Sequence, residues 1–279
     1  MNEYLEANRK RWDELTLEHE SSPFYDLAGF KAGKDRLRSI ELSELSDVAG
    51  KTMLHLQCHF GMDTLAWARR GAIVIGVDFS QKAITLAQSL SEEFSIAAEF
   101  VCSDIFELPN VLSGEFDIVF TSYGVLHGLP GLKRWGEVIA HFLKPGGIFY
   151  IVEDHPMFRV FRPKPEGEFK AERSYFFSET PQRIEGTGSY ATGNQGTTGV
   201  SYVWDFSMGD VINALIGAGL TIEFLHEFPY AARAKFPFMG GGWLVAAAPA
   251  PAWDDPVFVF VEGAERVRVV DWAYNWGWL

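Results

Sequence analysis

From residue 51 onward, short apolar runs alternate with amphipathic stretches, and this alternation limits the folds that the chain can adopt. The runs predict strands, and the amphipathic stretches predict helices between most of them. The expected elements are 52–57, 62–70, 72–77, 81–91, 98–102, 116–121, 131–143 and 146–153. Strands that alternate with helices are typical of βαβ units, in which a parallel sheet carries helices on its faces. We therefore expect an α/β fold with a doubly wound sheet.

Two strand ends carry residues suited to a nucleoside. The first strand leads into Gly61, and the second ends at Asp78. In doubly wound sheets a glycine at the first position lets a ligand approach the backbone, and an acid at the second accepts ribose hydroxyls. Asp78 could instead only precede the next helix, whose N-cap is Ser80. The spacing from Gly61 fits one crossover helix, and we therefore expect an adenosine-containing ligand.

Three further motifs follow in order: Cys102-Ser-Asp104, Phe116 to Gly124, and Leu143-Lys-Pro-Gly-Gly147. With the two strand ends, they make the chain resemble a class I S-adenosylmethionine-dependent methyltransferase of the small-molecule type. The resemblance implies a Rossmann-like, seven-stranded sheet with an antiparallel final strand. It also implies methyl transfer from S-adenosyl-L-methionine to an N, O or C nucleophile, with S-adenosyl-L-homocysteine as the product.

The first loop departs from the family pattern, which is usually acid-x-Gly-x-Gly-x-Gly. The matching positions are His55, Gln57, His59 and Gly61, so only the last glycine is kept. The resemblance implies that Phe79 and Ile105 line the adenine. The expected cofactor-binding residues are Gln57, His59, Gly61, Asp63, Thr64, Asp78, Phe79, Ser80, Ser103, Asp104, Ile105, Ser122 and Tyr123.

Four residues are candidates for chemistry on the methyl acceptor: His127, Glu153, His155 and Tyr25. The first three follow the fourth and fifth strands, and open α/β sheets bind ligands at such strand ends. Tyr25 lies in the N-terminal segment. A histidine can take a proton from a nucleophile near neutral pH. An equally acceptable interpretation gives these side chains only structural roles.

Two other classes of function fit part of the pattern. Asp78 would serve the ribose of NAD equally well, although the Gly-x-Gly-x-x-Gly motif of NAD-dependent oxidoreductases is missing. Glutamine and histidine at positions 57 and 59 also suit a non-catalytic cofactor-binding partner protein. His55-x-x-Cys58-His59 could suggest a metal site, but its side chains would point to alternate faces and no second half of a zinc motif follows. We therefore expect no metal.

Composition restricts the partners. The chain has 279 residues, 47% of them hydrophobic, and a formal charge of -13. A strongly acidic chain is unsuited to nucleic acid, whose binding requires Lys and Arg on phosphates. The two cysteines lack disulfide spacing, and no apolar run has the length of a membrane helix. We expect a cytoplasmic protein that acts on a small-molecule acceptor, without a nucleic-acid or membrane partner.

The rest of the chain predicts additions to this sheet. Residues 3–15 form an amphipathic pattern that includes Trp12, and a helix after Ser207 precedes strands at 221–228 and 242–248. Apolar runs at 257–261 and 267–270 could pair. We divide the chain into an N-terminal helical lid (1–50), the methyltransferase domain (51–155 and 206–249), an inserted β-rich cap (156–205) and a C-terminal extension (250–279). The extension is a candidate interface for a homodimer.

Overall fold

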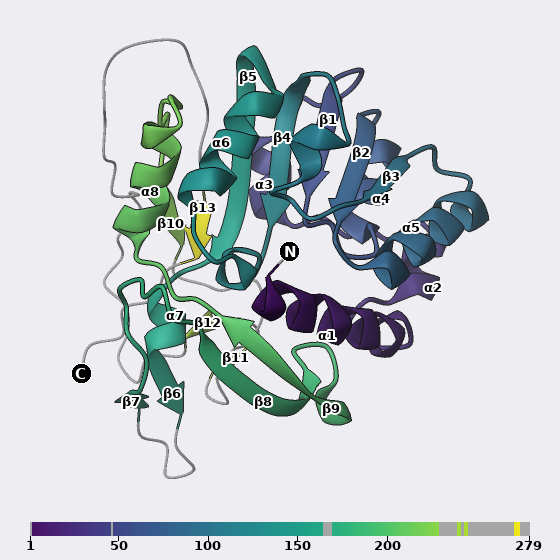
Figure 1. Cartoon of the computed structure of the whole chain (residues 1–279). Coiled ribbons are helices and arrows are strands. Elements are labelled where there is room, and N and C mark those ends of the chain that lie inside the picture. Colours follow the sequence, from purple (N-terminus) through teal and green to yellow (C-terminus); the bar gives the residue numbers. More distant parts are fainter. Residues whose placement is uncertain are drawn as a thin grey trace.

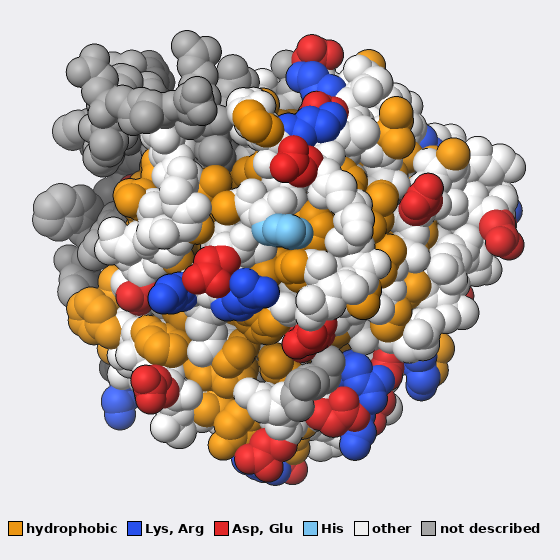
Figure 2. Space-filling view, turned by 45° about the horizontal axis from the view of Figure 1, so that its top comes forward, with side chains coloured by type: hydrophobic (Ala, Val, Ile, Leu, Met, Phe, Trp, Pro, Cys, Tyr) orange, Lys and Arg blue, Asp and Glu red, His pale blue; other side chains and the backbone are white. Residues whose placement is uncertain are grey.

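A computed structural model describes residues 2–45, 47–163 and 169–228, together with the backbone of 239–240, 243–244 and 271–273. Its centre is a sheet with helices on both faces (Figure 1). None of the helices in the described parts of the chain has both the length and the apolar character needed to cross a membrane. On the face shown in Figure 2, acidic and basic side chains of the described residues are interspersed, without a continuous basic stripe.

Five parallel strands form the main part of the sheet, in the order β5-β4-β1-β2-β3. They are β1 (Thr52–Leu56), β2 (Ile73–Asp78), β3 (Glu99–Cys102), β4 (Phe116–Ser122) and β5 (Leu143–Asp154). Leu54 pairs with Ile75 of β2 and with Val119 of β4, so β1 lies at the centre. This arrangement confirms the prediction of a Rossmann-like α/β fold with a parallel central sheet.

The edge beyond β5 differs from the prediction. Strand β13 (Asp271–Ala273) lies between β5 and β10 (His226–Phe228) and runs parallel to both. Of the strand predicted at 242–248, the structure describes only β12 (Trp243–Leu244), which pairs with β11 (Met239–Gly240) in a separate hairpin. The proposed pairing of 257–261 with 267–270 lies outside the described residues. An antiparallel final strand is therefore a wrong expectation for the described residues.

Two apolar cores cover the two faces of the sheet. Leu54 and Leu56 of β1 face a core shared with α6 (Lys133–Phe142) and α8 (Met208–Gly217). Met53 faces the opposite core, which includes residues of α3 (Ser39–Glu44), α4 (Met62–Arg69) and α5 (Gln81–Phe94). Successive side chains of a strand point to opposite faces, so β1 contributes to both cores.

Short elements complete the framework. They are α2 (Leu27–Lys31), the 3-10 helices η1 (Leu108–Asn110) and η2 (Leu126–Gly128), α7 (Met157–Val160), and the strands β6 (Phe161–Pro163) and β7 (Phe169–Ala171). Strands β6 and β7 form one antiparallel hairpin. A second, longer hairpin pairs β8 (Gln182–Ser189) with β9 (Gly193–Val203).

Helix α1 (Glu3–Glu20) extends five residues beyond the predicted 3–15 and lies along the longer hairpin (Figure 1). The Asn8 side chain bonds both backbone groups of Tyr202, donating to O at 2.7 Å and accepting from N at 2.7 Å. Arg11, 5% exposed, donates to the backbone oxygens of Gly188 and Thr197, each at 3.0 Å. These bonds join the first helix to a hairpin almost two hundred residues later.

Candidate functional site

A cavity of about 340 Å³ lies at the carboxyl ends of β1, β2 and β4, with Leu5, Asn8 and Trp12 of α1 forming one wall. Most of the predicted cofactor-binding residues line it. They are Gln57, His59, Gly61, Asp63, Asp78, Phe79, Ser103, Asp104, Ile105, Ser122 and Tyr123. The topology explains this meeting, because parallel strands bring their carboxyl ends to one edge of the sheet.

Two predicted residues have other partners. Thr64 is fully buried, and its Oγ1 lies 2.8 Å from His55 Nδ1. Ser80 caps α5 by accepting from Ala83 N at 3.1 Å, and its hydroxyl donates to Asp13 Oδ1 at 2.6 Å. Neither lines the cavity. Thr64 thus orients a buried histidine and Ser80 starts a helix, while cofactor binding by either residue stays a prediction.

The loop after β1 keeps a glycine-like backbone at positions that lack glycine. Gln57, His59 and Gly61 all have left-handed φ angles, of 56°, 53° and 74°. A non-glycine residue in this region costs roughly 1–2 kcal/mol. Gln57 Nε2 donates to Val125 O at 3.1 Å, and His59 N donates to Asp78 Oδ2 at 2.9 Å, which helps to hold this conformation.

Gly61 is required for packing as well as for its backbone angle. A Cβ atom at this position would lie 2.5 Å from Phe100 Cε1 and 3.1 Å from the Cβ of Ala87. These neighbours belong to β3 and α5, so the glycine allows the start of α4 to approach them closely. Gly61 is therefore expected to let a ligand approach the backbone, and it is also needed for close packing between helix and strand.

Asp78 is placed to accept hydrogen bonds from a ligand. Its side chain accepts from His59 N and Ser80 N, both at 2.9 Å, and the residue is 9% exposed. Burial raises the pKa of Asp78 to about 6, so the carboxylate is ionised at neutral pH. Each oxygen retains a lone pair, since a carboxylate can accept about four hydrogen bonds. Burial also raises the pKa of Asp104 above its ordinary value.

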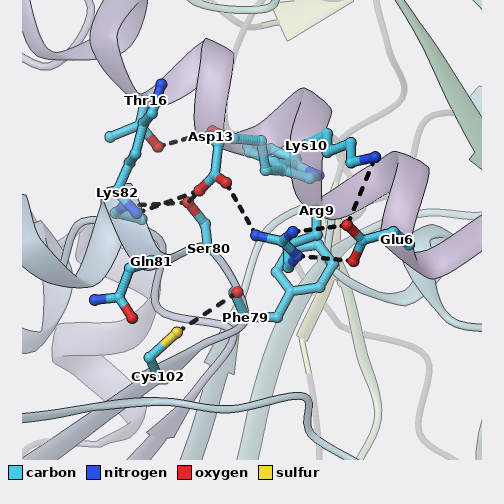
Figure 3. A network of polar contacts seen from close by, with 12 residues as sticks. Glu6, Arg9, Lys10, Asp13, Thr16, Phe79, Ser80, Gln81, Lys82 and Cys102 are labelled. Atoms are coloured by element: carbon cyan, nitrogen blue, oxygen red, sulfur yellow. Dashed lines mark hydrogen bonds and ion pairs between the residues drawn. The ribbon is translucent and has the colours of Figure 1, made fainter. Parts of the chain in front are cut away.

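Helix α1 is fastened beside this acid by a polar network (Figure 3). Asp13 Oδ1 accepts from the Ser80 hydroxyl at 2.6 Å and from Lys82 N at 3.2 Å. Its Oδ2 accepts from Arg9 Nη1 at 3.2 Å, and Arg9 is also paired with Glu6 at 2.7 Å. The carboxylate of one helix therefore binds the start of α5, immediately after Asp78.

The His-x-x-Cys-His motif does not converge on one point. His55 binds Thr64, and burial lowers the pKa of His55 to about 4. Cys58 is buried, whereas His59 Nε2 lies 2.9 Å from His19 Nδ1. Across the described parts of the chain, no cluster of three or more His, Cys, Asp or Glu side chains is arranged to hold a metal ion.

His59 belongs to an aromatic wall that the sequence did not predict. His19 Nε2 lies 2.7 Å from Ser189 Oγ, and the Trp12 and His59 ring centroids are 5.3 Å apart. The hydroxyls of Tyr25 and Tyr190 are hydrogen-bonded. Burial lowers the pKa of His59 well below its usual range and raises that of Tyr25. Both side chains are therefore neutral at physiological pH.

The four candidates for acceptor chemistry separate into two pairs. His127 and Tyr25 line the cavity, whereas Glu153 and His155 do not. Asp154, which lies between the latter two, lines it instead. Neighbouring side chains along a strand point in opposite directions, which explains why the intermediate residue reaches the cavity.

Glu153 and His155 have structural partners. The buried Glu153 carboxylate accepts from the backbone N of Gly124, of Val125 at 2.8 Å, of Leu126 at 3.3 Å and of Asp154 at 2.7 Å. His155 Nδ1 accepts from Met157 N at 3.1 Å, and its Nε2 lies 3.1 Å from Glu227 Oε1. These contacts give both side chains structural roles, and their action on the acceptor stays a prediction.

Charged residues of the N-terminal segment also line the cavity. Arg36 Nε lies 3.5 Å from Asp63 Oδ1, and its guanidinium is 4.9 Å from the centre of the Tyr25 ring. Glu41 is 1% exposed, and burial together with nearby Asp63 raises its pKa to about 7. No local motif marks these residues, because they reach the cavity only after the segment packs against α4.

Comparison with known proteins agrees with this geometry. Residues 54–151 match the methyltransferase domain family. An uncharacterized methyltransferase of Synechocystis sp. is 34% identical over 124 residues, which cover 44% of this chain and 56% of that protein. The ubiquinone biosynthesis O-methyltransferase of Coxiella burnetii is 31% identical over 126 residues, 45% of this chain and 52% of the relative.

Among solved structures, the DhpI complex with SAM and HEP has a TM-score of 0.50 and 18% sequence identity, covering 78% of this chain and 91% of that one. At this identity the likeness shows the fold alone. The chain spans about half the length of the curated relatives it matches. Residues 54–151 are thus similar to the methyltransferase domain family, which agrees with the class of protein that the motifs indicated.

Proposed function

We propose that this chain transfers the methyl group of S-adenosylmethionine to an N, O or C nucleophile of a small molecule and releases S-adenosylhomocysteine. The observation that carries the proposal is the meeting of Asp78, Phe79, Asp104 and Ile105 in one cavity at the carboxyl ends of the strands. An ionised acid beside an aromatic ring suits a ribose with its base, and the second acid and isoleucine suit the base edge.

The residues present fit the cofactor. The backbone of Gln57, His59 and Gly61 retains the left-handed path of a glycine-rich loop, and Asp78 has lone pairs for the ribose hydroxyls. Bound S-adenosylmethionine would supply an already activated sulfonium methyl group. The protein's main contribution would then be alignment and exclusion of water, with a base needed only for an acceptor that carries a proton of high pKa.

His127 is our choice for the group that orients the acceptor or takes its proton, because it lines the cavity beyond the end of β4. Tyr25 would form the opposite wall. We also propose that residues 1–50 act as a lid and 156–205 as a cap on the domain formed by 51–155 and 206–249. Helix α1 and the β8–β9 hairpin, which are hydrogen-bonded to each other, support this division.

A non-catalytic cofactor-binding protein is the second candidate. It is favoured by the side chains of Gln57 and His59, which stand at positions where the family usually has glycine. These side chains reduce the space beside the loop, yet both are held by defined contacts, with Val125 O and with His19. Binding and turnover must therefore be measured separately.

The first test is titration calorimetry with S-adenosylhomocysteine. Loss of the charge-assisted contact in Asp78→Ala should weaken binding by about 1.5–3 kcal/mol, roughly tenfold to a hundredfold. Asp47→Asn is the matched control, because that side chain is 84% exposed and unrelated to the cavity. Unchanged affinity in Asp78→Ala would sink the proposed site. A thermal-shift comparison with NAD tests the oxidoreductase alternative.

The second test is turnover. S-adenosylhomocysteine release is followed with a panel of small phenols, amines and carbon acids as acceptors. Methyl transfer to any of them supports the enzyme. Tight cofactor binding without transfer to any acceptor favours the non-catalytic protein.

A further inference from the structure

A small side chamber of about 40 Å³ opens beyond the ends of β4 and β5. Gly124, His127, Asp154 and Arg159 line both this chamber and the main cavity. The buried rings of Trp204 and Phe206 form part of its remaining wall. A water molecule has a share of about 30 Å³ in the liquid, so the chamber has the size of one small polar group.

Arg159 is held in this chamber by a buried carboxylate. Its Nε donates to Asp205 Oδ1 at 2.6 Å, and the Asp205 side chain is 5% exposed. Gln182 Nε2 donates to the other oxygen of Asp205 at 2.9 Å. The two terminal nitrogens of Arg159 make no hydrogen bond with any residue that the structure describes. The planar end of the guanidinium is thus fixed in position and retains its donors.

The carboxyl groups beside Arg159 already have partners within the protein. Asp205 also lies 3.3 Å from Arg173 Nε, so one carboxylate is shared by two guanidinium groups. The Glu153 carboxylate in the same wall is bound to four backbone N–H groups.

We propose that Arg159 binds a carboxylate group of the methyl acceptor in this side chamber and selects monocarboxylates over neutral or cationic analogues. This inference rests on the proposed function, because only a methyltransferase has a methyl acceptor. Arginine presents paired donors that match a planar carboxylate, and an apolar wall strengthens such a pair. The rest of the acceptor would lie in the main cavity beside His127, on the side away from Asp78.

Three probes of similar shape test the selection: benzoate, benzamide and benzylamine. Each is titrated into the wild-type protein with and without saturating S-adenosylhomocysteine. Benzoate should bind at least tenfold more tightly than the other two. Arg159→Gln should abolish this preference, whereas Arg159→Lys, which lacks the planar fork, should retain only part of it.

The affinity for S-adenosylhomocysteine distinguishes a failure of the carboxylate proposal from a failure of the proposed methyltransferase function. Equal binding of benzoate and benzamide, no benzoate binding, or an unchanged preference for benzoate in Arg159→Gln overturns the carboxylate proposal. Failure of S-adenosylhomocysteine to bind contradicts the proposed function instead, and the titrations without it still report the charge preference. Arg159→Gln leaves a buried Asp205 less well paired. The double variant Arg159→Gln/Asp205→Asn removes both charges of the pair and leaves the net charge of the protein unchanged. It should lose the same preference while keeping its affinity for S-adenosylhomocysteine within about twofold.

Discussion

Glu153 fixes the geometry of the acceptor side from outside the main cavity. Its carboxylate binds the backbone N–H groups of residues 124–126, which follow the turn at Tyr123 and Gly124, where φ is 37° and 84°. A non-glycine residue with positive φ persists only where its surroundings hold it. The position of His127, one residue further along, therefore depends on this buried acid.

Replacement of His127 tests its part in the reaction. His127→Ala should lower the rate of methyl transfer about a hundredfold if the histidine takes a proton, while the affinity for S-adenosylhomocysteine stays unchanged. Steady-state rates and calorimetry on the same preparations provide the two readouts. His141→Ala, on the exposed side of α6, is the control. Normal turnover in His127→Ala would leave alignment as the explanation of catalysis.

Glu41 predicts a pH dependence of stability. Its pKa is about 7 in the folded protein and 4.5 as an ordinary value, so the folded state binds the proton more tightly. The resulting stabilisation is complete below about pH 4.5 and is lost as the pH rises through 7. The total change is about 3 kcal/mol. Glu41→Gln removes this dependence and should be more stable than the wild type at pH 8.

Urea unfolding at pH 5 and pH 8 measures this difference. As the pH rises, the free energy of unfolding of the wild type should fall by up to about 3 kcal/mol relative to that of Glu41→Gln. Glu92→Gln, at an exposed position on α5, should show no such movement. A constant gap for Glu41→Gln would mean that the carboxyl ionises freely in the folded protein.

At the scale of elements, α1 is held to the hairpin by several bonds and to the sheet domain by few. Asp13 and His19 provide contacts to Ser80, Lys82 and His59. Loss of the Asp13 charge in Asp13→Asn should weaken docking by about 1 kcal/mol and speed hydrogen exchange of α1 about fivefold. S-adenosylhomocysteine should slow exchange over residues 3–33 in the wild type.

Mass spectrometry of exchanged peptides reports both effects. Glu3→Gln is the control, because this exposed acid lies in the first turn of the same helix. Exchange that is identical in Asp13→Asn and the wild type would show that the Asp13 charge does not hold α1 against the sheet domain. Exchange that is identical with and without ligand would rule out a lid ordered by the cofactor.

Elements with strong local patterns could be predicted, whereas long-range pairings could not. The strands of the parallel sheet and the helix capped by Ser80 follow from alternating apolar residues and a capping side chain, which are local properties. The place of β13 between β5 and β10 depends on partners more than forty residues away, so no local pattern defines it. The antiparallel last strand was for this reason predicted wrongly.

The same division holds for the site. Asp78 and Asp104 line the cavity as expected, because strand ends identify them. Thr64, Ser80, Glu153 and His155 do not line it, because nearness in the chain does not give the direction of a side chain. Arg159 was missed because its arrival at the cavity depends on how α7 packs. The contact of His19 with His59 likewise depends on the packing of α1.

For the whole molecule, truncation tests the role of the C-terminal extension. A chain ending after Pro249 lacks β13, which pairs with both β5 and β10. Its melting temperature should fall by several degrees, since each kcal/mol corresponds to about 2–4 °C in a chain of this size. Light scattering tests in parallel whether the extension forms a homodimer interface.

A chain ending after Ala273 retains β13 and is the control for this truncation. It should melt close to the full-length protein. If the chain ending after Pro249 keeps the oligomeric state, melting temperature and solubility of the full-length protein, then residues 250–279 are neither an interface nor a structural layer.

The bonds between α1 and the β8–β9 hairpin also have a consequence for biosynthesis. Asn8 and Arg11 find their partners at residues 188–202, which leave the ribosome much later. Helix α1 can thus complete its docking to the hairpin only after β1 to β5 have emerged. The nascent chain can therefore assemble the strand ends that form the nucleoside half of the site before the β8–β9 hairpin is available to hold the wall formed by α1.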